Sequence, residues 1–309
     1  MAQQAINTNG LDPAGTGSDT ARTAFEKANA NFTELYAGMA RGDAFALLPG
    51  MRNLLINGDF SINQRTFAGG DLAAGVYGFD RWKAGSGGCS VTVNGTTGVV
   101  THVSGPLVQV IEAPRIAGQA VTVSVEDPSG SITVNVDGVT GTITAGVGRR
   151  GVTLTVPAGS TGNVTLTLTA TNVSYRRVMM EMGSRATGWD ARPAALEALL
   201  CDRYFQVFTI NRGPLFLSYT ANTDTRGRIF YPTPMRAAPS VGFSATTWNV
   251  IGFGNGTSVT NITITVGLGA ADPEGLSITV SVNSDLQAAG SHVVWASSTP
   301  VTIKLEAEL

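Results

Sequence analysis

The chain has 309 residues, which is long enough for two domains that each bury a core of their own. Its formal net charge is −2, so the composition excludes a basic surface for nucleic acid or for acidic lipid. Cys89 and Cys201 are the only cysteines, too few for a disulfide framework or a cysteine-rich metal site, and we expect both to be buried free thiols.

The first 17 residues are rich in Gln, Asn, Gly and Thr, and Asp12-Pro13 adds a further break in regular structure. We therefore predict an extended arm over residues 1–17. This terminus is polar, unlike a signal peptide, and no apolar run approaches the roughly 18 residues that span a bilayer. We expect neither a signal for export nor a membrane anchor.

A helix is predicted over residues 18–42, where Ser18 and Asp19 supply N-cap oxygens. Its apolar residues are spaced alternately four and three apart, which is the heptad spacing of a coiled coil. The predicted oligomerisation residues on this seam are Phe25, Ala28, Phe32, Leu35 and Met39. A lone helix would leave two phenylalanines in water, so we expect partner helices; the alternative is a helix that folds back on its own β domain.

Residues 50–192 are predicted to form a β-sandwich. The segment Asn53 to Arg65 has apolar residues on even positions and a turn at Asn57 to Asp59, and Tyr77 to Trp82 gives a second aromatic strand. Alternation then repeats, with Asn-Gly, Asp-Gly and Pro-Ser-Gly as separators, and no helix interrupts it. Further strands are expected around Val91–Val93, Val99–Val103, Val108–Val110, Val121–Val125, Ile132–Val136, Val152–Val156 and Val164–Leu168. This pattern excludes βαβ winding and its nucleotide crevice.

Pro193 stands at a first-turn position, so a short helical linker is predicted over residues 193–208. Residues 209–309 are again rich in strand patterns and predict a second β-sandwich domain. Strands are expected around Ile262–Val266, Leu276–Val282, Val293–Trp295 and Ile303–Leu305. The predicted fold class is therefore mainly β, with a coiled-coil-like N-terminal helix and two sandwiches.

No combination of residues predicts an enzyme, a metal site or a cofactor. His102 and His292 each stand alone in a strand pattern, without partners for a triad or for zinc. Asp80 and Asp190 are the obvious pair for glycoside cleavage, but each adjoins a core motif and is interpreted as a structural hydrogen-bond acceptor or, with Arg81, an ion pair. Asn57 and Asp59 could hold calcium, yet they are better explained as a turn.

Glycan binding needs aromatic faces and paired polar groups that converge on an exposed surface. Residues of this kind occur in the C-terminal part of the chain, although core packing or a subunit interface explains the two tryptophans equally well. The candidates for receptor or glycan binding are Tyr219, Arg226, Arg228, Tyr231, Trp248 and Trp295.

Four motifs of the chain together resemble those of a known protein family. They are Asn-Leu-Leu-Ile-Asn-Gly-Asp-Phe (53–60), Phe-Asp-Arg-Trp (79–82), Trp-Asp-x-Arg-Pro (189–193) and Leu-Cys-Asp-Arg-Tyr-Phe (200–205). Together they resemble the jelly-roll module of tail fibres and receptor-binding proteins of tailed bacteriophages, over roughly residues 50–208. The run from Gly17 to Leu35, Met235 to Val241 and the closing Leu-Glu-Ala-Glu-Leu are also similar to segments of such fibres.

The resemblance implies a carbohydrate-binding-module-like jelly roll in a homotrimer, located on the virion and made in the host cytoplasm. It implies that residues 1–45 attach to a tail, baseplate or capsid protein, and that the distal β domain contacts a host surface glycan or another receptor. Two other functions stay open. One is a purely structural head or baseplate decoration, and the other is a capsular polysaccharide depolymerase.

Overall fold

A computed structural model describes residues 21–40, 51–210, 214–221, 224–244, 247–252, 258–265, 271–281, 291–296 and 301–309. Over these residues the protein is mainly β, with several antiparallel sheets and two helices. The predicted arm over residues 1–17 and the predicted caps Ser18 and Asp19 lie outside the described residues. Neither helix of the described part is long and apolar enough to cross a membrane.

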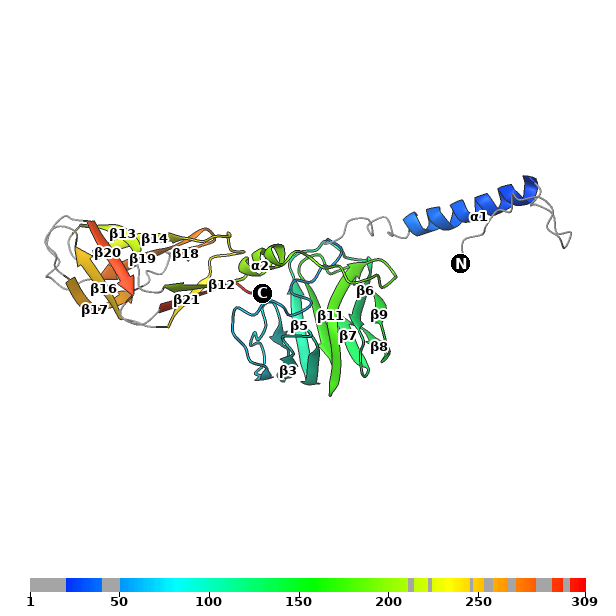
Figure 1. Ribbon diagram of the computed structural model, residues 1–309, viewed down its shortest axis with the longest axis horizontal. Helices are drawn as coiled ribbons and strands as arrows, with labels where there is room; N and C mark the ends of the chain where they lie inside the picture. The colour runs from blue at the N-terminus through cyan, green and yellow to red at the C-terminus, as the bar shows by residue number, and fades with distance from the viewer. Residues whose placement is uncertain are drawn as a thin grey trace.

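The first helix, α1, runs over Ala21–Ala40, within the predicted range 18–42. Phe25 and Phe32 are 71% and 56% exposed on it. Figure 1 shows α1 apart from all the sheets, at one end of the molecule. The alternative in which this helix packs back on its own β domain is therefore not the arrangement seen.

Residues 70–182 form two antiparallel sheets, which we call the sheet pair. The six-stranded sheet has the order β1(Gly70–Leu72), β3(Cys89–Val93), β4(Val100–Ser104), β11(Val173–Met182), β6(Ala120–Glu126) and β9(Arg149–Thr155). The five-stranded sheet has the order β2(Lys83–Ala84), β5(Pro106–Ile111), β10(Val164–Thr169), β7(Ile132–Val136) and β8(Val139–Ile143). Buried side chains of both sheets belong to a single apolar core.

Alternation of apolar and polar residues produces this core in strands that have one buried face and one solvent-exposed face. In β7 the buried residues are Ile132, Val134 and Val136, and in β10 they are Val164, Leu166 and Leu168, all with no exposed surface. Side chains two apart on a strand point to the same face, so each strand presents its branched residues to the core and its threonines outward.

Two segments predicted as strands have other structures. Residues 53–65 form turns and loop, and Asn57 and Phe60 take left-handed backbone angles with φ of 57° and 59°. Residues 77–82 form a turn closed by the single bridge Tyr77 to Lys83, followed by the two-residue strand β2. Arg81 takes a φ of 71° in the second segment. These left-handed residues turn the chain away from an extended path, and neither segment pairs as a regular strand.

The second helix, α2, spans Ala194–Asp202, with Pro193 at its N-cap position. β12(Phe205–Ile210) follows at once and starts inside the stretch predicted as a helical linker. β12 pairs with β21(Val301–Glu306), which pairs in turn with β15(Ser240–Phe243). We call these three strands the junction sheet.

The remaining described strands form a fourth sheet, which we call the outer sheet. Its order is β14(Asp224–Phe230), β13(Pro214–Ala221), β20(Ser291–Ala296), β16(Thr247–Gly252), β17(Ser258–Thr265), β19(Gly275–Ser281) and β18(Ala271–Asp272). β14 also pairs with β19 over seven residues, so six of these strands close into a ring. A second β-sandwich domain was predicted over residues 209–309; the described strands there form this sheet and the junction sheet, and the β14–β19 pairing closes the outer sheet on itself, which removes most free edges. Figure 1 shows the outer sheet at the end opposite α1.

Candidate functional site

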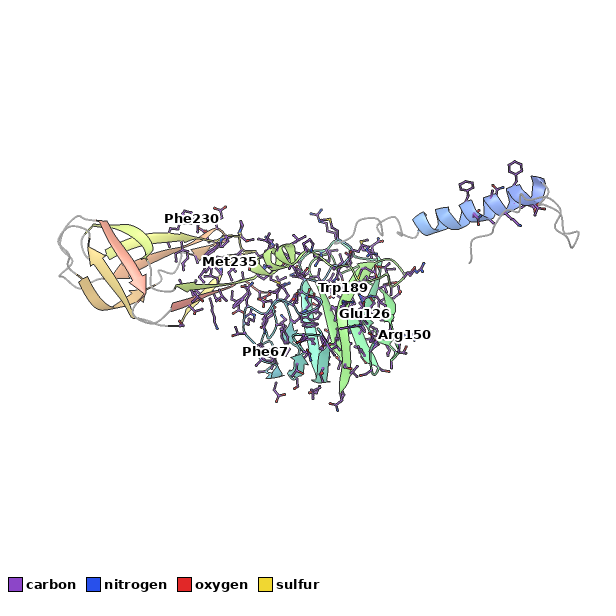
Figure 2. The ribbon with its side chains drawn as sticks, in the orientation of Figure 1. Phe67, Glu126, Arg150, Trp189, Phe230 and Met235 are labelled. Atoms are coloured by element: carbon purple, nitrogen blue, oxygen red, sulfur yellow. The ribbon has the colours of Figure 1, made fainter. Side chains whose placement is uncertain are left out.

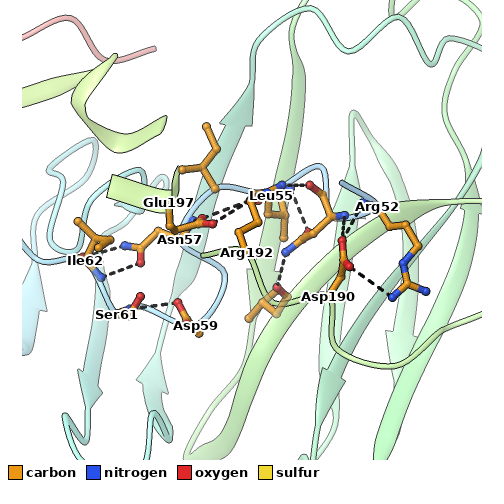
Figure 3. Close-up of polar contacts among 12 residues, drawn as sticks. Arg52, Leu55, Asn57, Asp59, Ser61, Ile62, Asp190, Arg192 and Glu197 are labelled. Atoms are coloured by element: carbon orange, nitrogen blue, oxygen red, sulfur yellow. Dashed lines mark hydrogen bonds and ion pairs between the residues drawn. The ribbon is translucent and has the colours of Figure 1, made fainter. Parts of the chain in front are cut away.

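The Trp-Asp-x-Arg-Pro motif closes onto the segment that begins the sheet pair (Figure 3). The Arg52 backbone N–H donates to Asp190 Oδ2 at 2.7 Å, and the Arg52 guanidinium pairs with the same carboxylate at 3.4 Å. Arg192 donates to the Leu55 carbonyl at 2.8 Å and pairs with Glu197 of α2 at 3.1 Å. Both acids are buried, so each needs these partners to stay charged.

Asn57 organises the loop of the first motif. Its side-chain oxygen accepts the Ile62 N–H at 2.9 Å, and its Nδ2 donates to the carbonyls of Ile62 and Asp80 at 2.8 and 3.0 Å. Trp82 Nε1 donates to the Asn57 carbonyl at 2.8 Å. Asp59 accepts the Ser61 N–H at 3.2 Å, so the oxygens considered for calcium act in a turn. The described residues contain no group of three potential His, Cys, Asp or Glu ligands.

Asp80 is buried beside this loop, and its Oδ2 accepts the Gln64 N–H at 2.6 Å. Burial raises the pKa of Asp80 to about 6. Its Oδ1 is buried without a hydrogen-bond partner in the described part of the chain. Arg81 pairs with Glu308 across the junction and not with Asp80, so of the two interpretations of Asp80 the structural hydrogen-bond acceptor holds and the ion pair with Arg81 does not. Asp80 and Asp190 thus both hold structure.

His102 lies in the core with no exposed surface. One ring nitrogen lies 3.0 Å from Tyr175 Oη, and the other lies 2.7 Å from the Gly105 carbonyl and 3.6 Å from Cys89 Sγ. Burial lowers the pKa of His102 and raises that of Cys89 to about 11. The thiol is therefore neutral at physiological pH and unsuited to nucleophilic attack. Cys89 and Cys201 are both free and buried, which confirms the prediction.

The candidates for receptor binding are spread over the outer sheet. Tyr219 of β13 lies opposite Arg226 of β14 in the strand register. Trp248 of β16 lies opposite Ala296, and Trp295 of β20 lies opposite Asn249. The side chains of all four candidates lie outside the described part of the structure.

Arg228 and Tyr231 are described in full. Arg228 pairs with Asp272 at 2.5 Å, and its Cζ lies over the Phe230 ring, 5.4 Å from the centroid. Phe230 is 73% exposed, and Figure 2 shows it between the outer sheet and the sheet pair. Tyr231 is 8% exposed and stacks on Phe208 with the centroids 6.4 Å apart. Tyr231 is therefore a packing residue and not part of an open contact surface.

The predicted oligomerisation residues all lie on α1. Phe25 and Phe32 are exposed and Ala28 is half-buried, while the side chains of Leu35 and Met39 lie outside the described part. Two exposed phenylalanines seven residues apart lie on one face of a helix. The described half of the seam thus presents apolar rings to solvent.

Residues 306–309 form a clasp between the junction sheet and the sheet pair. Glu308 pairs with buried Arg81, and also with Arg65 at 3.2 Å. Tyr77 Oη and Lys83 Nζ each donate to the Leu309 main-chain oxygen at 2.5 Å. Burial raises the pKa of Tyr77, so its hydroxyl keeps the proton that it donates. The clasp fixes the returning strand β21 against residues 65–83.

A cavity of about 220 Å³ lies beside this clasp, between α2 and the end of β5. Leu54, Ile56 and Leu200 supply apolar walls. Glu112 at its edge receives Arg203 Nη2 at 3.1 Å and the Tyr204 hydroxyl at 2.9 Å. These residues come from three separate segments of the chain.

Sequence reasoning missed this cavity. It noted Arg203 and Tyr204 only as parts of a family motif, and it did not single out Glu112. A signal existed, because Glu112 directly follows the predicted strand that contains Val108, Val110 and Ile111, at the point where that strand ends. Nothing in the sequence places that strand end against residue 203, since the pairing joins residues 91 apart.

Comparison with known proteins does not assign this chain to a family. No family model and no curated protein matches the chain. Among solved structures, vicilin from Solanum lycopersicum (tomato) is 7% identical, covers 81% of this chain and 85% of its own, and has a TM-score of 0.15. Protein Ylba from E. coli is 9% identical, with coverages of 77% and 91% and a TM-score of 0.12. An oxalate decarboxylase is 8% identical, with coverages of 68% and 69% and a TM-score of 0.10. Likenesses this weak carry no argument about fold or function.

Proposed function

We propose that the protein is a non-enzymatic fibre subunit of a tailed-bacteriophage virion. In this proposal the sheet pair is a jelly-roll β-sandwich, residues 1–45 attach the subunit to a tail, baseplate or capsid protein, and residues 209–309 contact a host surface glycan or another receptor. The subunit is a homotrimer, made in the host cytoplasm, that needs no cofactor. Three weak sites on one fibre then bind by avidity.

The observation that carries the proposal is the position of α1. It presents Phe25 and Phe32 to solvent at the end of the molecule opposite the outer sheet (Figure 1). Rings this exposed are typical of a helix that has partners in its assembled state. An apolar seam at one end and a separate closed sheet at the other suit a subunit that assembles at one end and displays the other.

Two of the four motifs support the jelly-roll part of the proposal. The motifs at residues 53–60 and 189–193 meet in one buried polar network that joins residues 52–57 to residues 190–197 (Figure 3). A network of this kind suits a stable display scaffold. Its buried carboxylates, Asp190 and Glu197, are each paired with an arginine, so both act in holding the fold together.

The assembly step is tested by measuring the mass of the intact chain in solution with light scattering. We expect a trimer at micromolar concentration. Phe32→Asp should weaken assembly because it places three carboxylates together in an apolar seam. Ala30→Asp is the matched control, since it adds the same charge at an exposed position of α1 outside the predicted seam. A monomeric wild type, or equal weakening by both variants, would refute the seam.

The display step is tested by adsorption to susceptible cells. Exchange of residues 209–309 between two such fibres should transfer the binding preference, and electron microscopy of particles should place the protein on an outward-pointing fibre. Tyr219→Ala and Arg226→Ala should reduce adsorption, while the far-ultraviolet spectrum stays unchanged. A trimer that binds no cell or glycan, on particles that infect normally without it, favours the decoration function instead.

A further inference from the structure

The short helix α2 turns its acidic residue inward and its leucines outward. Glu197 is buried, and its carboxylate pairs with Arg192 at 3.1 Å and accepts the Asn57 backbone N–H. Leu196 and Leu199 are 37% and 49% exposed. A helix on a protein surface normally packs its apolar residues on the core and leaves its charged residues in water. α2 therefore presents to solvent the kind of side chain that packing normally covers.

The outward residues of α2 form one face without charge. Leu196 and Leu199 are three positions apart, and Ala195 is four positions before Leu199, so the three lie on the same side of the helix. Ala195 is exposed as well. Glu197 and Cys201, also four positions apart, are buried on the opposite side. We call Ala195, Leu196 and Leu199 the α2 face.

The orientation of α2 is fixed by the network beneath it. Arg192 donates to the Leu55 carbonyl at 2.8 Å and holds Glu197, and both charged side chains are about nine-tenths buried. Rotation of the helix that buried Leu196 and Leu199 would pull Glu197 away from Arg192 and leave a buried cation without its anion. The α2 face therefore stays outward in the folded chain, and a cover for it must come from outside this arrangement.

Other exposed apolar side chains lie along the same edge of the molecule. Figure 1, which views the molecule down its shortest axis, shows α2 on the upper edge and α1 extending from that edge at one end. α1 carries the exposed rings of Phe25 and Phe32. Towards the other end Phe230, which is 73% exposed, lies on the upper edge in Figure 2. The α2 face is thus the middle of a line of apolar groups along the long axis.

The length of this line favours a second copy of the chain as the partner. A stable interface buries about 800 Å² on each side, whereas a helix of nine residues is only about 14 Å long and cannot supply that area alone. A parallel copy set alongside would cover α1, the α2 face and the Phe230 edge together. Because rotation about an axis along this edge keeps each residue at its own level, the α2 face would meet its own equivalent, and an uncharged face does so without repulsion.

We propose that the α2 face is a lateral interface with a second copy of this chain, in which α2 of one subunit packs against α2 of the next. The inference rests on the proposed homotrimer and gives it a second contact besides the α1 seam of Phe25 and Phe32. The three-fold axis then runs along the upper edge of Figure 1. A contact at the middle of the subunit holds the three outer sheets at a fixed spacing, which binding by avidity requires.

The test is cross-linking of the full chain that carries Leu199→Cys. Cys89 and Cys201 are buried and burial raises the pKa of both thiols, so the introduced thiol is the reactive one. Mild oxidation should give a covalent dimer on a denaturing gel, because two cysteines join where their Cα atoms approach within about 7 Å. Thr140→Cys is the matched control and should stay single, since Thr140 is exposed on β8, away from α2 (Figure 1).

A charged variant measures how much the α2 face contributes to assembly. Leu199→Glu places carboxylates of neighbouring copies together and should raise the concentration at which the trimer dissociates by at least about tenfold. Thr140→Glu adds the same charge elsewhere and should stay within about twofold of the wild type. Light scattering gives the mass, and thermal unfolding checks that each variant is folded.

The outcomes separate this interface from the rest of the proposed function. A trimer in which Leu199→Cys does not cross-link and Leu199→Glu dissociates as the wild type does would overturn the α2 interface and leave the α1 seam in place. Cross-linking at Leu199 with no effect of Phe32→Asp would be the reverse case, in which the α2 interface holds and the seam fails. A Leu199→Glu trimer that no longer enters particles would show that another virion protein covers the face, and would also overturn the assignment to a second copy.

Discussion

Glu308 offers a sharp test of how the end of the described chain is held. Its side chain is 4% exposed and pairs with Arg81, which is 1% exposed, and with Arg65 at 3.2 Å. Glu308→Ala would leave the Arg81 guanidinium buried with its remaining bond to the Val110 carbonyl and its contact with the Tyr204 ring. A buried cation that loses its anion is strongly destabilising.

The magnitude follows from burial. Removing one partner of a buried ion pair costs about 3–5 kcal/mol, and because Arg81 keeps two of its contacts we expect about 3 kcal/mol for Glu308→Ala. Glu306 is the matched control, since it also pairs with Arg65, at 3.1 Å, but is 42% exposed. An exposed pair contributes about 0–1 kcal/mol, so Glu306→Ala should stay within about 1 kcal/mol of the wild type.

The assay is urea unfolding followed by tryptophan fluorescence. Trp82 is fully buried in the sheet pair and donates to the Asn57 carbonyl, so its emission reports on the half of the molecule that the clasp contacts. With a denaturant slope of about 3 kcal/mol per molar, a loss of about 3 kcal/mol lowers the midpoint by about 1 M. Equal midpoints for the two glutamate variants would refute the argument that the buried pair holds the junction.

Two further substitutions test the loop that carries the first motif. A Cβ on Gly58 would lie 2.2 Å from the Val178 carbonyl oxygen, so Gly58→Ala should lower the free energy of unfolding by about 2–3 kcal/mol, while Gly159→Ala, with open space around it, should be nearly neutral in the same urea experiment. The pKa of Asp80 is raised to about 6 in the folded state, above its unfolded value of about 3.9, so the folded protein holds this proton more tightly and its stability falls as pH rises from about 4 to 6. Asp80→Asn should flatten that slope and raise stability at pH 7 by up to about 3 kcal/mol, and an unchanged slope would show that another group titrates there.

Strands were predictable from the sequence where one face is buried and the other is exposed to solvent. β7 and β10 read as clean alternation because each has buried branched residues separated by threonines or asparagine. β11 was not predicted, although it lies between β4 and β6 in the larger sheet. Val178, Met179, Met180 and Glu181 are all buried, and Arg177 takes a φ of 54° where the register shifts. The bulge and the burial of both faces of β11 remove the alternation of apolar and polar residues on which the strand prediction rests.

The opposite error occurred at residues 53–65, where alternation is present and no strand forms. The apolar residues there contact the core from a loop, and Asn57 supplies through its side chain the hydrogen bonds that a neighbouring strand would have supplied. An Asn side chain can replace a ladder in this way, and it leaves the apolar pattern unchanged. Composition could not separate the two cases, because the partner residues Asp80 and Glu197 come from distant segments.

The motifs indicated a connected region of the fold, but not how its charges are shared. Arg81 shows why, because its guanidinium meets Glu308 of the clasp, the Val110 carbonyl, the Tyr204 ring and the cavity at once. Its neighbour Asp80 stands next to it in the sequence and takes no part in that pairing; its carboxyl accepts a backbone N–H, and burial raises its pKa to about 6. A change at Arg81 should therefore lower the free energy of unfolding, because it removes the pair with Glu308 and the hydrogen bond to the Val110 carbonyl together.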